Sequence, residues 1–259
     1  MERYLIITGA SSGLGEVFAD RFARAKNNLV LVARREEKLA ALKQKLEREH
    51  GVSVEVLPAD LSQADAAPVL FEEVQRRGIE IHGVVNNAGF GWNGTFSDQE
   101  MASLESLINV NLVSLTKLTR LFLPAMITRN EGLILNVSST GAFQPVPHFA
   151  VYAALKAYVY SFTLALAEEL KKTKVRVFCL CPGATRTGFQ EAAGQTNPKS
   201  VGGWQTSEEV VDFAMRRLRG RKSFGIPGLN NRFAAFMNRL VPAKVATRIS
   251  GRLMRPEER

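Results

Sequence analysis

Short apolar runs alternate along the chain with longer segments in which apolar residues recur every three or four positions. The runs are rich in β-branched residues and predict buried strands, whereas the periodic segments predict amphipathic helices. Strands are expected at residues 4–8, 28–33, 53–58, 82–86, 132–138 and 175–181, with a short last strand near 223–226. Helices are expected at about 14–26, 35–49, 63–77, 98–127 and 151–172.

This alternation predicts an α/β fold with a doubly wound, Rossmann-type, mostly parallel seven-stranded sheet and helices on both faces. A chain of 259 residues with 46% hydrophobic residues and a mean hydropathy of −0.06 suits a single soluble domain of this kind. Ligands bind such a sheet beyond the carboxyl ends of its strands. We therefore expect functional residues directly after the strands.

The first predicted strand runs into a glycine-rich turn, TGASSGLG at residues 8–15, and an amphipathic helix follows. Gly9, Gly13 and Gly15 lie where a backbone must turn tightly, approach a phosphate and present helix N–H groups to it. The spacing G-x-x-x-G-x-G differs from the commoner G-x-G-x-x-G pattern. An ordinary turn with spare glycines is the alternative, but strand and helix flank these glycines as a dinucleotide site requires.

A serine, a tyrosine and a lysine follow the fifth predicted strand. Tyr152 and Lys156 are four residues apart and share one helix face, and Ser139 precedes Tyr152 by thirteen positions. A serine, a tyrosine and a lysine at this spacing can assemble a proton-donating site. Tyr152 is the candidate donor, and the Lys156 ammonium is expected to lower its pKa from about 10.

Together these motifs resemble those of the short-chain dehydrogenase/reductase family, in its shorter-subunit branch. The matching segments occur in that family's order: TGASSGLG at 8–15, NNAG at 86–89, Asn111 in INVNL, Ser139, YAALK from Tyr152, and Pro182-Gly183. The resemblance covers roughly residues 3–228. It implies a catalytic domain over 1–228, with 229–259 as a basic helical C-terminal extension, and an oxidoreductase acting on CH–OH groups.

The resemblance also assigns roles to residues. Lys156 would bind the nicotinamide ribose, Ser139 would steady the substrate oxygen, and Asn111 would hold a water that links the lysine to solvent. Ser138 is the rival for the serine role, although the spacing to the tyrosine favours Ser139. The expected cofactor contacts are Gly9, Ser11, Ser12, Gly13, Leu14, Gly15, Arg34, Arg35, Asp60, Leu61, Asn87, Ala88, Gly89, Tyr152, Lys156, Pro182, Gly183, Thr185 and Thr187.

Two of these contacts follow the third strand. By resemblance, Asp60 and Leu61 lie against the adenine. Asp60 would instead cap a helix if one begins near Ser62.

The residues after the second predicted strand bear on the choice of dinucleotide. An NAD site has an Asp or Glu there, whereas this chain has Ala33, Arg34 and Arg35. A guanidinium offers a planar fork of donors that suits a 2′-phosphate. The alternative is a solvated pair that balances Glu36 and Glu37. We expect NADP(H) to be preferred over NAD(H).

A loop of over twenty residues without a clear period, at about 184–206, follows Pro182-Gly183. Such loops are usually lids or disordered, and in the family this segment closes over substrate. Apolar residues near the expected site predict a pocket for a 3-oxoacyl thioester, a steroid-like ketone or a long-chain aldehyde. They are Phe90, Trp92, Phe143, Val146, Phe149, Phe189 and Trp204. For each of them the alternative is that the side chain packs in the hydrophobic core and does not contact substrate. His148 has no assigned role.

Cysteine, histidine and apolar content bound the remaining possibilities. Cys179 and Cys181 alternate in a predicted strand, and we expect them on opposite faces of the sheet, unable to bond each other readily. Three scattered histidines predict no metal site. The chain has no unbroken run of eighteen apolar residues and no leader, so we expect a cytoplasmic protein without a membrane span.

The positive charge is concentrated near the C-terminus. Residues 216–259 hold twelve basic and two acidic residues, whereas residues 1–215 hold 22 and 23. The tail predicts two amphipathic helices around Pro242, with apolar stripes at Phe233, Phe236, Met237 and Leu240 and at Val245, Ile249 and Leu253. Such helices bind an anionic membrane, an acidic carrier protein or coenzyme A phosphates. The alternative is that both stripes pack on the body or on a second subunit.

The combined pattern predicts an NADP(H)-dependent carbonyl reductase, or the reverse alcohol dehydrogenase, for an apolar ketone or aldehyde. A membrane-peripheral lipid-pathway reductase and a non-catalytic dinucleotide sensor are alternatives, and the sensor is disfavoured because Tyr152 and Lys156 are both present. A third alternative is an epimerase or dehydratase that uses the same Tyr and Lys with bound NAD; relatives of that kind usually carry a larger C-terminal substrate domain and an acidic residue after the second strand, and this chain has neither. By resemblance, we expect a homodimer or homotetramer paired through the helices at 98–127 and 151–172, and no nucleic-acid partner.

Overall fold

The computed structural model describes residues 3–195 and 202–256 of the chain. Within those residues, seven strands form one sheet in which every neighbouring pair is parallel. The strands are β1 Arg3–Thr8, β2 Asn28–Ala33, β3 Val54–Pro58, β4 Glu80–Asn86, β5 Gly132–Val137, β6 Val175–Leu180 and β7 Phe224–Gly225. The predicted seven-stranded sheet is confirmed.

Helices connect the strands and extend the chain beyond the last one. They are α1 Gly13–Arg24, α2 Glu36–His50, α3 Ala66–Arg76, α4 Met101–Ile108, α5 Leu115–Arg129, α6 Ala150–Glu169, α7 Phe189–Ala192, α8 Ser207–Leu218, α9 Leu229–Met237 and α10 Ala243–Met254. Helix α8 was not predicted. Its start nevertheless carries a sequence signal, because the side chains of Thr206 and Glu209 form a reciprocal capping box there.

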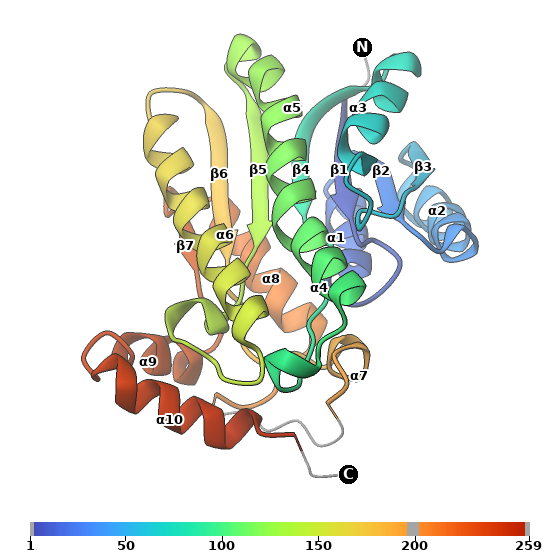
Figure 1. Cartoon of the computed structure of the whole chain (residues 1–259). Coiled ribbons are helices and arrows are strands. Elements are labelled where there is room, and N and C mark those ends of the chain that lie inside the picture. Colours follow the sequence, from blue (N-terminus) through green and yellow to red (C-terminus); the bar gives the residue numbers. More distant parts are fainter. Residues whose placement is uncertain (1–2, 196–201, 257–259) are drawn as a thin grey trace.

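The strand order β3-β2-β1-β4-β5-β6-β7 places the start of the chain inside the sheet, and the chain then winds outward in both directions (Figure 1). Side chains alternate between the two faces of each strand. Leu5 and Ile7 therefore enter one apolar layer with residues of α1, α2 and α8, while Ile6 enters a second layer with residues of α3, α5 and α6. With both faces covered, the open edge at the strands' carboxyl ends remains for a site.

The helix predicted at 98–127 contains an irregular turn. Helix α4 continues through a π-helical turn, η2 Asn109–Ser114, into α5. A π turn adds a residue to the helical ring and rotates the side chains that follow, and such turns are frequent at functional sites. This one holds Asn111, which is fully buried.

Two helices could cross a membrane on length and composition alone, although no unbroken apolar run predicted such a span. They are the continuous helix Met101–Arg129 and helix α6. In this fold, Leu118 and Phe122 of the first and Leu166 of the second pack in the apolar layer on one face of the sheet. That packing buries 39% of the apolar window in the first helix and 33% of it in the second, so it accounts for only part of their apolar character.

The prediction for the two cysteines is wrong. Residues two positions apart along a strand share a face, and the Cys179 and Cys181 Sγ atoms lie 3.7 Å apart. Both are buried free thiols.

The C-terminal helices pack on the body through small or polar residues rather than through their apolar stripes. Ala235 of α9 and Ala246 and Ser250 of α10 are buried, whereas Phe233, Phe236, Leu240, Val245 and Ile249 are exposed. A small side chain lets the helix axis approach closely, as where Ser250 Oγ donates to Pro145 O at 2.8 Å. The alternative in which both stripes pack on the body of the same chain is therefore wrong.

A buried chain of polar side chains joins the two central strands to the helices beside them. Asn86 Nδ2 of β4 donates to Thr119 Oγ1 of α5 at 3.0 Å and to Asn136 Oδ1 of β5 at 2.9 Å. Asn136 Nδ2 in turn donates to Thr163 Oγ1 of α6 at 2.9 Å. Thr163 follows Lys156 by two helical turns, so these bonds fix the register of α6 against the sheet.

Asn136→Leu is expected to destabilise the fold by about 2–4 kcal/mol, because it leaves buried donors and acceptors of Asn86 and Thr163 without partners. Equilibrium unfolding in urea measures the change. Gln44→Leu, a polar-to-apolar change at an exposed position of α2, is the control and is expected to shift stability by less than about 0.5 kcal/mol. A loss for Asn136→Leu no larger than the control's would show that the chain of bonds adds nothing to stability.

Candidate active site

A cavity of about 1010 Å³ opens at the carboxyl edge of the sheet and collects most of the predicted site. Loops after β1 to β6 all contribute to its wall. Every predicted cofactor contact except Gly15 lines it, as do Ser139, Tyr152 and Lys156 among the predicted catalytic residues. Gly15 and Asn111 lie behind the wall, where they shape the residues in front of them.

The glycine-rich turn after β1 is held by close packing. Gly9 and Gly13 have φ angles of +67° and +59°, a conformation that favours glycine. A Cβ on Gly15 would stand 2.1 Å from Gly9 O and 2.7 Å from Asn87 Nδ2. The turn therefore needs glycine at these positions, and it presents the start of α1 to the cavity as an anion-binding surface.

The NNAG segment after β4 is tied to the same turn. Thr8 Oγ1 accepts hydrogen bonds from the N–H groups of Asn87 and Ala88, each at 3.0 Å. Asn87 Nδ2 donates to Thr8 O at 2.9 Å. These bonds set the two loops side by side, so that both can contact one extended ligand.

Arg35 reaches from the start of α2 to the glycine-rich turn. Its Nη2 donates to Ser11 Oγ at 3.0 Å and to Ser12 Oγ at 3.1 Å. Arg34 and Lys38 also line the cavity there. Lys38 was missed in the sequence, although it lies one helical turn after Arg34.

Asp60 does not cap a helix. Its Oδ1 accepts a hydrogen bond from Ser62 N at 3.1 Å in a turn that precedes α3, which begins only at Ala66. Asp60 and Leu61 line the cavity.

Tyr152 and Ser139 meet at the inner end of the cavity. Tyr152 projects from α6, and Ser139 follows β5, where its Oγ accepts from Gly141 N at 3.1 Å. A hydrogen bond from Ser139 to Tyr152 joins the two hydroxyls. The rings of Phe149 and Phe189 flank the tyrosine, with centroids 5.9 and 5.3 Å from its own. The phenol thus stands in an apolar setting with one polar partner.

Lys156 is buried behind Tyr152, with 4% of its surface exposed. Its Nζ donates to Val137 O at 3.0 Å and lies 5.5 Å from the centroid of the tyrosine ring. The rival serine, Ser138, is used structurally, because its Oγ donates to the backbone oxygen of Lys156 at 2.7 Å. That bond leaves Ser139 as the serine hydroxyl beside the tyrosine.

Burial is the main cause of the pKa shifts of Tyr152 and Lys156, and the sequence did not predict this. It raises the pKa of Tyr152 to about 12, and the hydrogen bond from Ser139 only partly offsets this rise. The expected lowering of the tyrosine pKa by Lys156 is therefore not seen in this structure. Burial also lowers the pKa of Lys156 from 10.5 to about 8. At neutral pH, the tyrosine holds its proton and the lysine is close to losing one.

Asn111 presents an unused acceptor near Lys156. Its Nδ2 donates to Phe90 O at 3.1 Å and to Leu107 O at 3.0 Å, while its buried Oδ1 has no hydrogen-bond partner among the described residues. A Cβ on Gly89 would stand 2.7 Å from that oxygen and 3.4 Å from Lys156 Nζ. A buried acceptor of this kind fits a bound water or another donor.

The family model described as short chain dehydrogenase matches residues 3–198. The chain belongs to the short-chain dehydrogenase family. It is 38% identical over 193 residues to human 17-beta-hydroxysteroid dehydrogenase type 3, covering 73% of this chain and 61% of that enzyme. It is 33% identical over 206 residues to the ketoacyl reductase HetN of a Nostoc species, covering 76% and 71%.

Among solved structures, a short-chain dehydrogenase from Sphingobium yanoikuyae in complex with NADPH superposes with a TM-score of 0.82. The two chains are 34% identical, and the match covers 92% of this chain and 93% of that one. The chain thus spans about three fifths of the human relative's length but nearly all of the bacterial structure.

The predicted apolar lining of the cavity is found only in part. Phe90, Val146, Phe149, Phe189 and Trp204 line the cavity as predicted. Trp92 instead lines a smaller neighbouring cavity of about 230 Å³ together with His148, and Phe143 packs edge-on against Tyr160. The described part of the predicted lid loop 184–206 lies along the cavity; residues 196–201 of that loop lie outside the described residues.

Helix α10 contributes a wall that the sequence did not predict. Ser250, Leu253 and Met254 line the cavity, and Asn93 Nδ2 donates to Met254 O at 3.0 Å. The periodicity of the tail showed an amphipathic helix, but it contained no information on where that helix docks.

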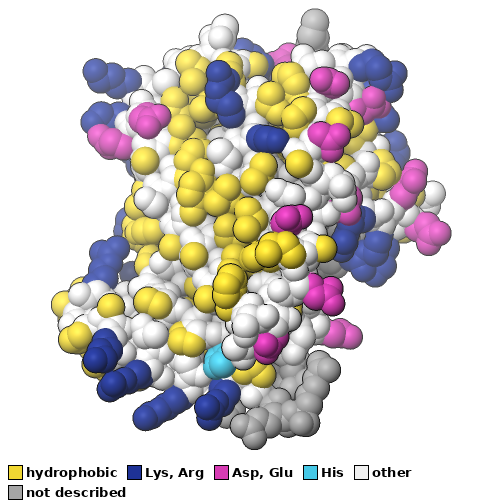
Figure 2. All heavy atoms as spheres, in the orientation of Figure 1, with side chains coloured by type: hydrophobic (Ala, Val, Ile, Leu, Met, Phe, Trp, Pro, Cys, Tyr) yellow, Lys and Arg dark blue, Asp and Glu magenta, His cyan; other side chains and the backbone are white. Residues whose placement is uncertain are grey.

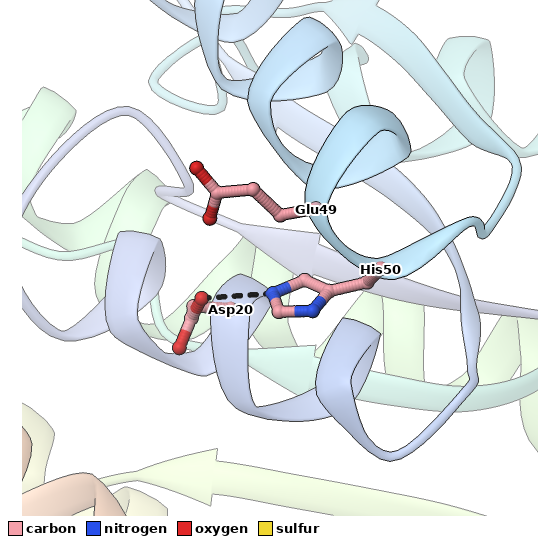
Figure 3. Close-up of side chains that lie close together, drawn as sticks. All are labelled: Asp20, Glu49 and His50. Atoms are coloured by element: carbon pink, nitrogen blue, oxygen red, sulfur yellow. Dashed lines mark hydrogen bonds and ion pairs between the residues drawn. The ribbon is translucent and has the colours of Figure 1, made fainter.

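A group of possible metal ligands lies away from the cavity. Atoms of Asp20, Glu49 and His50 lie within 4.8 Å of one another, between α1 and the end of α2 (Figure 3). His50 Nε2 and Asp20 Oδ1 are 3.0 Å apart, and Arg21 and Arg48 pair with Asp20 and Glu49. Because cations of the chain already meet both carboxylates, we interpret the group as a link between two helices.

Lys156→Met is expected to stabilise the ligand-free dehydrogenase while removing its function. A folded-state pKa of about 8 against 10.5 means that holding a buried ammonium costs about 3 kcal/mol below pH 8, fading as pH rises to 10.5. Loss of the bond to Val137 O offsets part of the gain, so unfolding at pH 7 should show about 1–3 kcal/mol more stability.

The pH dependence is the control for this prediction. The advantage of the Met variant should shrink between pH 8 and 10.5, because the wild-type lysine becomes neutral there and no longer costs stability. A variant less stable than wild type at pH 7 would contradict the assignment of a net cost to the buried charge.

Proposed function

We propose that this dehydrogenase reduces an apolar ketone with NADPH, and runs the reverse oxidation when the cofactor ratio favours it. The observation that carries the proposal is the meeting of Ser139, Tyr152 and Lys156 in a cavity that is also lined by the glycine-rich turn after β1. The reaction class follows from a protonated phenol placed where a carbonyl oxygen would lie.

The residues present fit a bound dinucleotide. The glycine turn leaves room that a Cβ would fill, and the N–H groups at the start of α1 suit a pyrophosphate. Leu61 and Asn87 would border the adenosine, while Thr185 and Thr187 would face the nicotinamide amide. When bound, the nicotinamide supplies a hydride to the carbonyl carbon.

The protein's own part in the reaction is to receive the charge that builds on the carbonyl oxygen. Tyr152 donates its phenolic proton to that oxygen, and Ser139 holds the oxygen by a hydrogen bond. The Lys156 ammonium favours the phenolate left behind. A water on the unpaired Oδ1 of Asn111 would connect the lysine to solvent and allow the proton to be replaced.

An apolar substrate is supported by the cavity wall and by the similar proteins. Phe149, Phe189 and Met254 pack in one apolar cluster with Tyr152, and Trp204 also lines the cavity. Burial of apolar substrate surface favours binding there. The similar proteins are named for hydroxysteroid and ketoacyl chemistry. We infer a steroid-like ketone or a 3-oxoacyl thioester as the substrate class.

NADP(H) preference is part of the proposal. Arg34, Arg35 and Lys38 place three cations at the end of β2, and no acidic residue follows that strand before Glu36. The similar structure from Sphingobium holds NADPH. Three cations at one end of the cavity suit a ligand with an added phosphate.

Three further expectations stay predictions. They are the homodimer or homotetramer, the cytoplasmic location, and the division into a catalytic domain at 1–228 and an extension at 229–259. A non-catalytic sensor is disfavoured because the complete Ser139, Tyr152 and Lys156 set is present.

Tyr152→Phe is expected to lower ketone reduction by about 10³-fold or more, since the proton donor for the developing alkoxide is lost. Binding of NADPH, followed by the change in its fluorescence, should stay within about twofold. Tyr158→Phe removes a hydroxyl from the same helix, one that bonds Thr116 Oγ1 at 3.0 Å, and should leave turnover nearly unchanged. Persistent turnover in Tyr152→Phe would overturn the proposed function.

Replacing Arg34 and Arg35 together by Ala is expected to raise the KM for NADPH by about 10–100-fold, because charge-assisted hydrogen bonds to the 2′-phosphate are lost. The KM for NADH should change less than about threefold. The control, Lys45→Ala with Arg48→Ala, makes the same charge change on α2 away from the cavity. Equal effects on the two cofactors would count against NADP(H) preference.

A further inference from the structure

The C-terminal helices expose an unusual concentration of large apolar side chains. Leu229, Phe233, Phe236, Leu240, Val245 and Ile249 are all exposed, with Phe233 and Phe236 at 66% and 57%. Helices α9 and α10 lie side by side below the carboxyl edge of the sheet (Figure 1). Contiguous exposed apolar residues of this kind mark an interaction site. We call these six residues the apolar patch.

The charge around the apolar patch has one sign. Residues 229–254 contain five basic residues and no acidic one; they are Arg232, Arg239, Lys244, Arg248 and Arg252. Figure 2 shows a row of Lys and Arg side chains along α10 and hydrophobic side chains over α9 and α10 beside it. Helix positions 244, 248 and 252 are spaced four residues apart, so their side chains form a basic row along one face.

The inner faces of the same helices are fixed on the body. Ser250 Oγ donates to Pro145 O at 2.8 Å, and Asn231 Nδ2 donates to Gln205 Oε1 at 3.1 Å. Arg239 Nη2 reaches Tyr160 OH at 3.4 Å. The apolar patch is therefore presented on a docked platform, and the helices need not detach to expose it.

We propose that the apolar patch and its basic row dock this dehydrogenase on an anionic lipid bilayer. The aromatic and aliphatic side chains would enter the lipid, and the arginines and the lysine would meet lipid phosphates. Pairing two copies through this surface would bring together five cations of each copy, none of which forms an ion pair within the described part of the chain, and this disfavours a second copy as the occupant. An acidic protein would match the charge but leaves the exposed phenylalanines without an apolar counterpart.

The position of the surface connects it to the cavity. Helix α10 exposes Val245 and Ile249 outward, while its Leu253 and Met254 line the substrate end of the cavity. A protein docked on this helix has the cavity mouth close to the lipid. Resting on the proposed function, the bilayer is then the reservoir from which an apolar ketone enters.

Co-sedimentation with vesicles tests the docking without any turnover. Full-length protein should bind vesicles of phosphatidylcholine with about 30% phosphatidylserine at least tenfold more tightly than pure phosphatidylcholine, with binding weakened by salt. Phe233→Ser with Phe236→Ser should lower this binding at least tenfold. Lys244→Gln, Arg248→Gln and Arg252→Gln together should remove the preference for the anionic lipid.

Matched variants keep the test specific. Phe96→Ser with Met101→Ser removes two other exposed apolar side chains, and this double variant should bind vesicles within twofold of wild type. Arg216→Gln, Arg219→Gln and Arg221→Gln make the same charge change near the amino end of β6, where Arg176 contacts Arg217 O. Thermal unfolding and turnover of a water-soluble ketone should match wild type in all variants, which separates loss of docking from loss of fold or of the reductase activity.

The outcomes divide clearly. A result in which all four variants bind vesicles as tightly as wild type would overturn the proposal. So would a change from dimer to monomer in Phe233→Ser with Phe236→Ser, measured by light scattering, since it would make the apolar patch a subunit interface. Binding to an acidic carrier protein without vesicle binding would overturn it as well. Absence of ketone reduction with intact vesicle binding would reject the proposed function and leave the docking surface standing.

Discussion

The buried ammonium of Lys156 is the constraint around which the rest of the site is arranged. A charge with 4% exposure is costly to hold, and the structure supplies one hydrogen bond, from Nζ to Val137 O, to offset that cost. The lysine can stay there only if α6 keeps its register on β5. The buried bonds from Asn86 through Asn136 to Thr163 provide that register. The buried Lys156 ammonium thus lowers the stability of the fold, and the buried hydrogen bonds to Thr163 on the same helix stabilise it.

Close packing determines the shape of the glycine-rich turn after β1. Gly9 and Gly15 are required because neighbouring backbone and Asn87 occupy the volume that side chains would need, while Gly13 has a φ of +59° and lies against the Thr187 side chain. Thr8 then ties the glycine turn to the segment after β4. The result is a cradle formed by two loops that are distant in sequence and rigid relative to each other, and it is continuous with the pocket beside Tyr152.

The two faces of the C-terminal helices differ in side-chain size, and this difference decides which face packs on the body. Small residues such as Ala246 and Ser250 allow close packing on the body, and this packing carries Leu253 and Met254 into the cavity wall. The larger apolar residues then have no place inside and remain outside. A helix whose apolar stripe faces solvent on a folded domain is an exception to the usual amphipathic arrangement, and it is the basis for the proposed bilayer contact.

The sequence by itself determined the sheet, the order of its elements and the identity of most site residues. It could do so because strand periodicity, the glycine turn and the Tyr152–Lys156 spacing are local patterns, each contained in a short segment of the sequence. Only the tertiary structure decided the sign of the Tyr152 pKa shift, the π turn at Asn111, the shared face of Cys179 and Cys181, and the docking of α10 over the cavity. Each of these depends on what packs against a residue from elsewhere in the chain. Burial raises the pKa of Tyr152 and the hydrogen bond with Ser139 only partly offsets it, while the buried face of α10 is the one with small side chains, which carry little hydrophobic signal in the sequence.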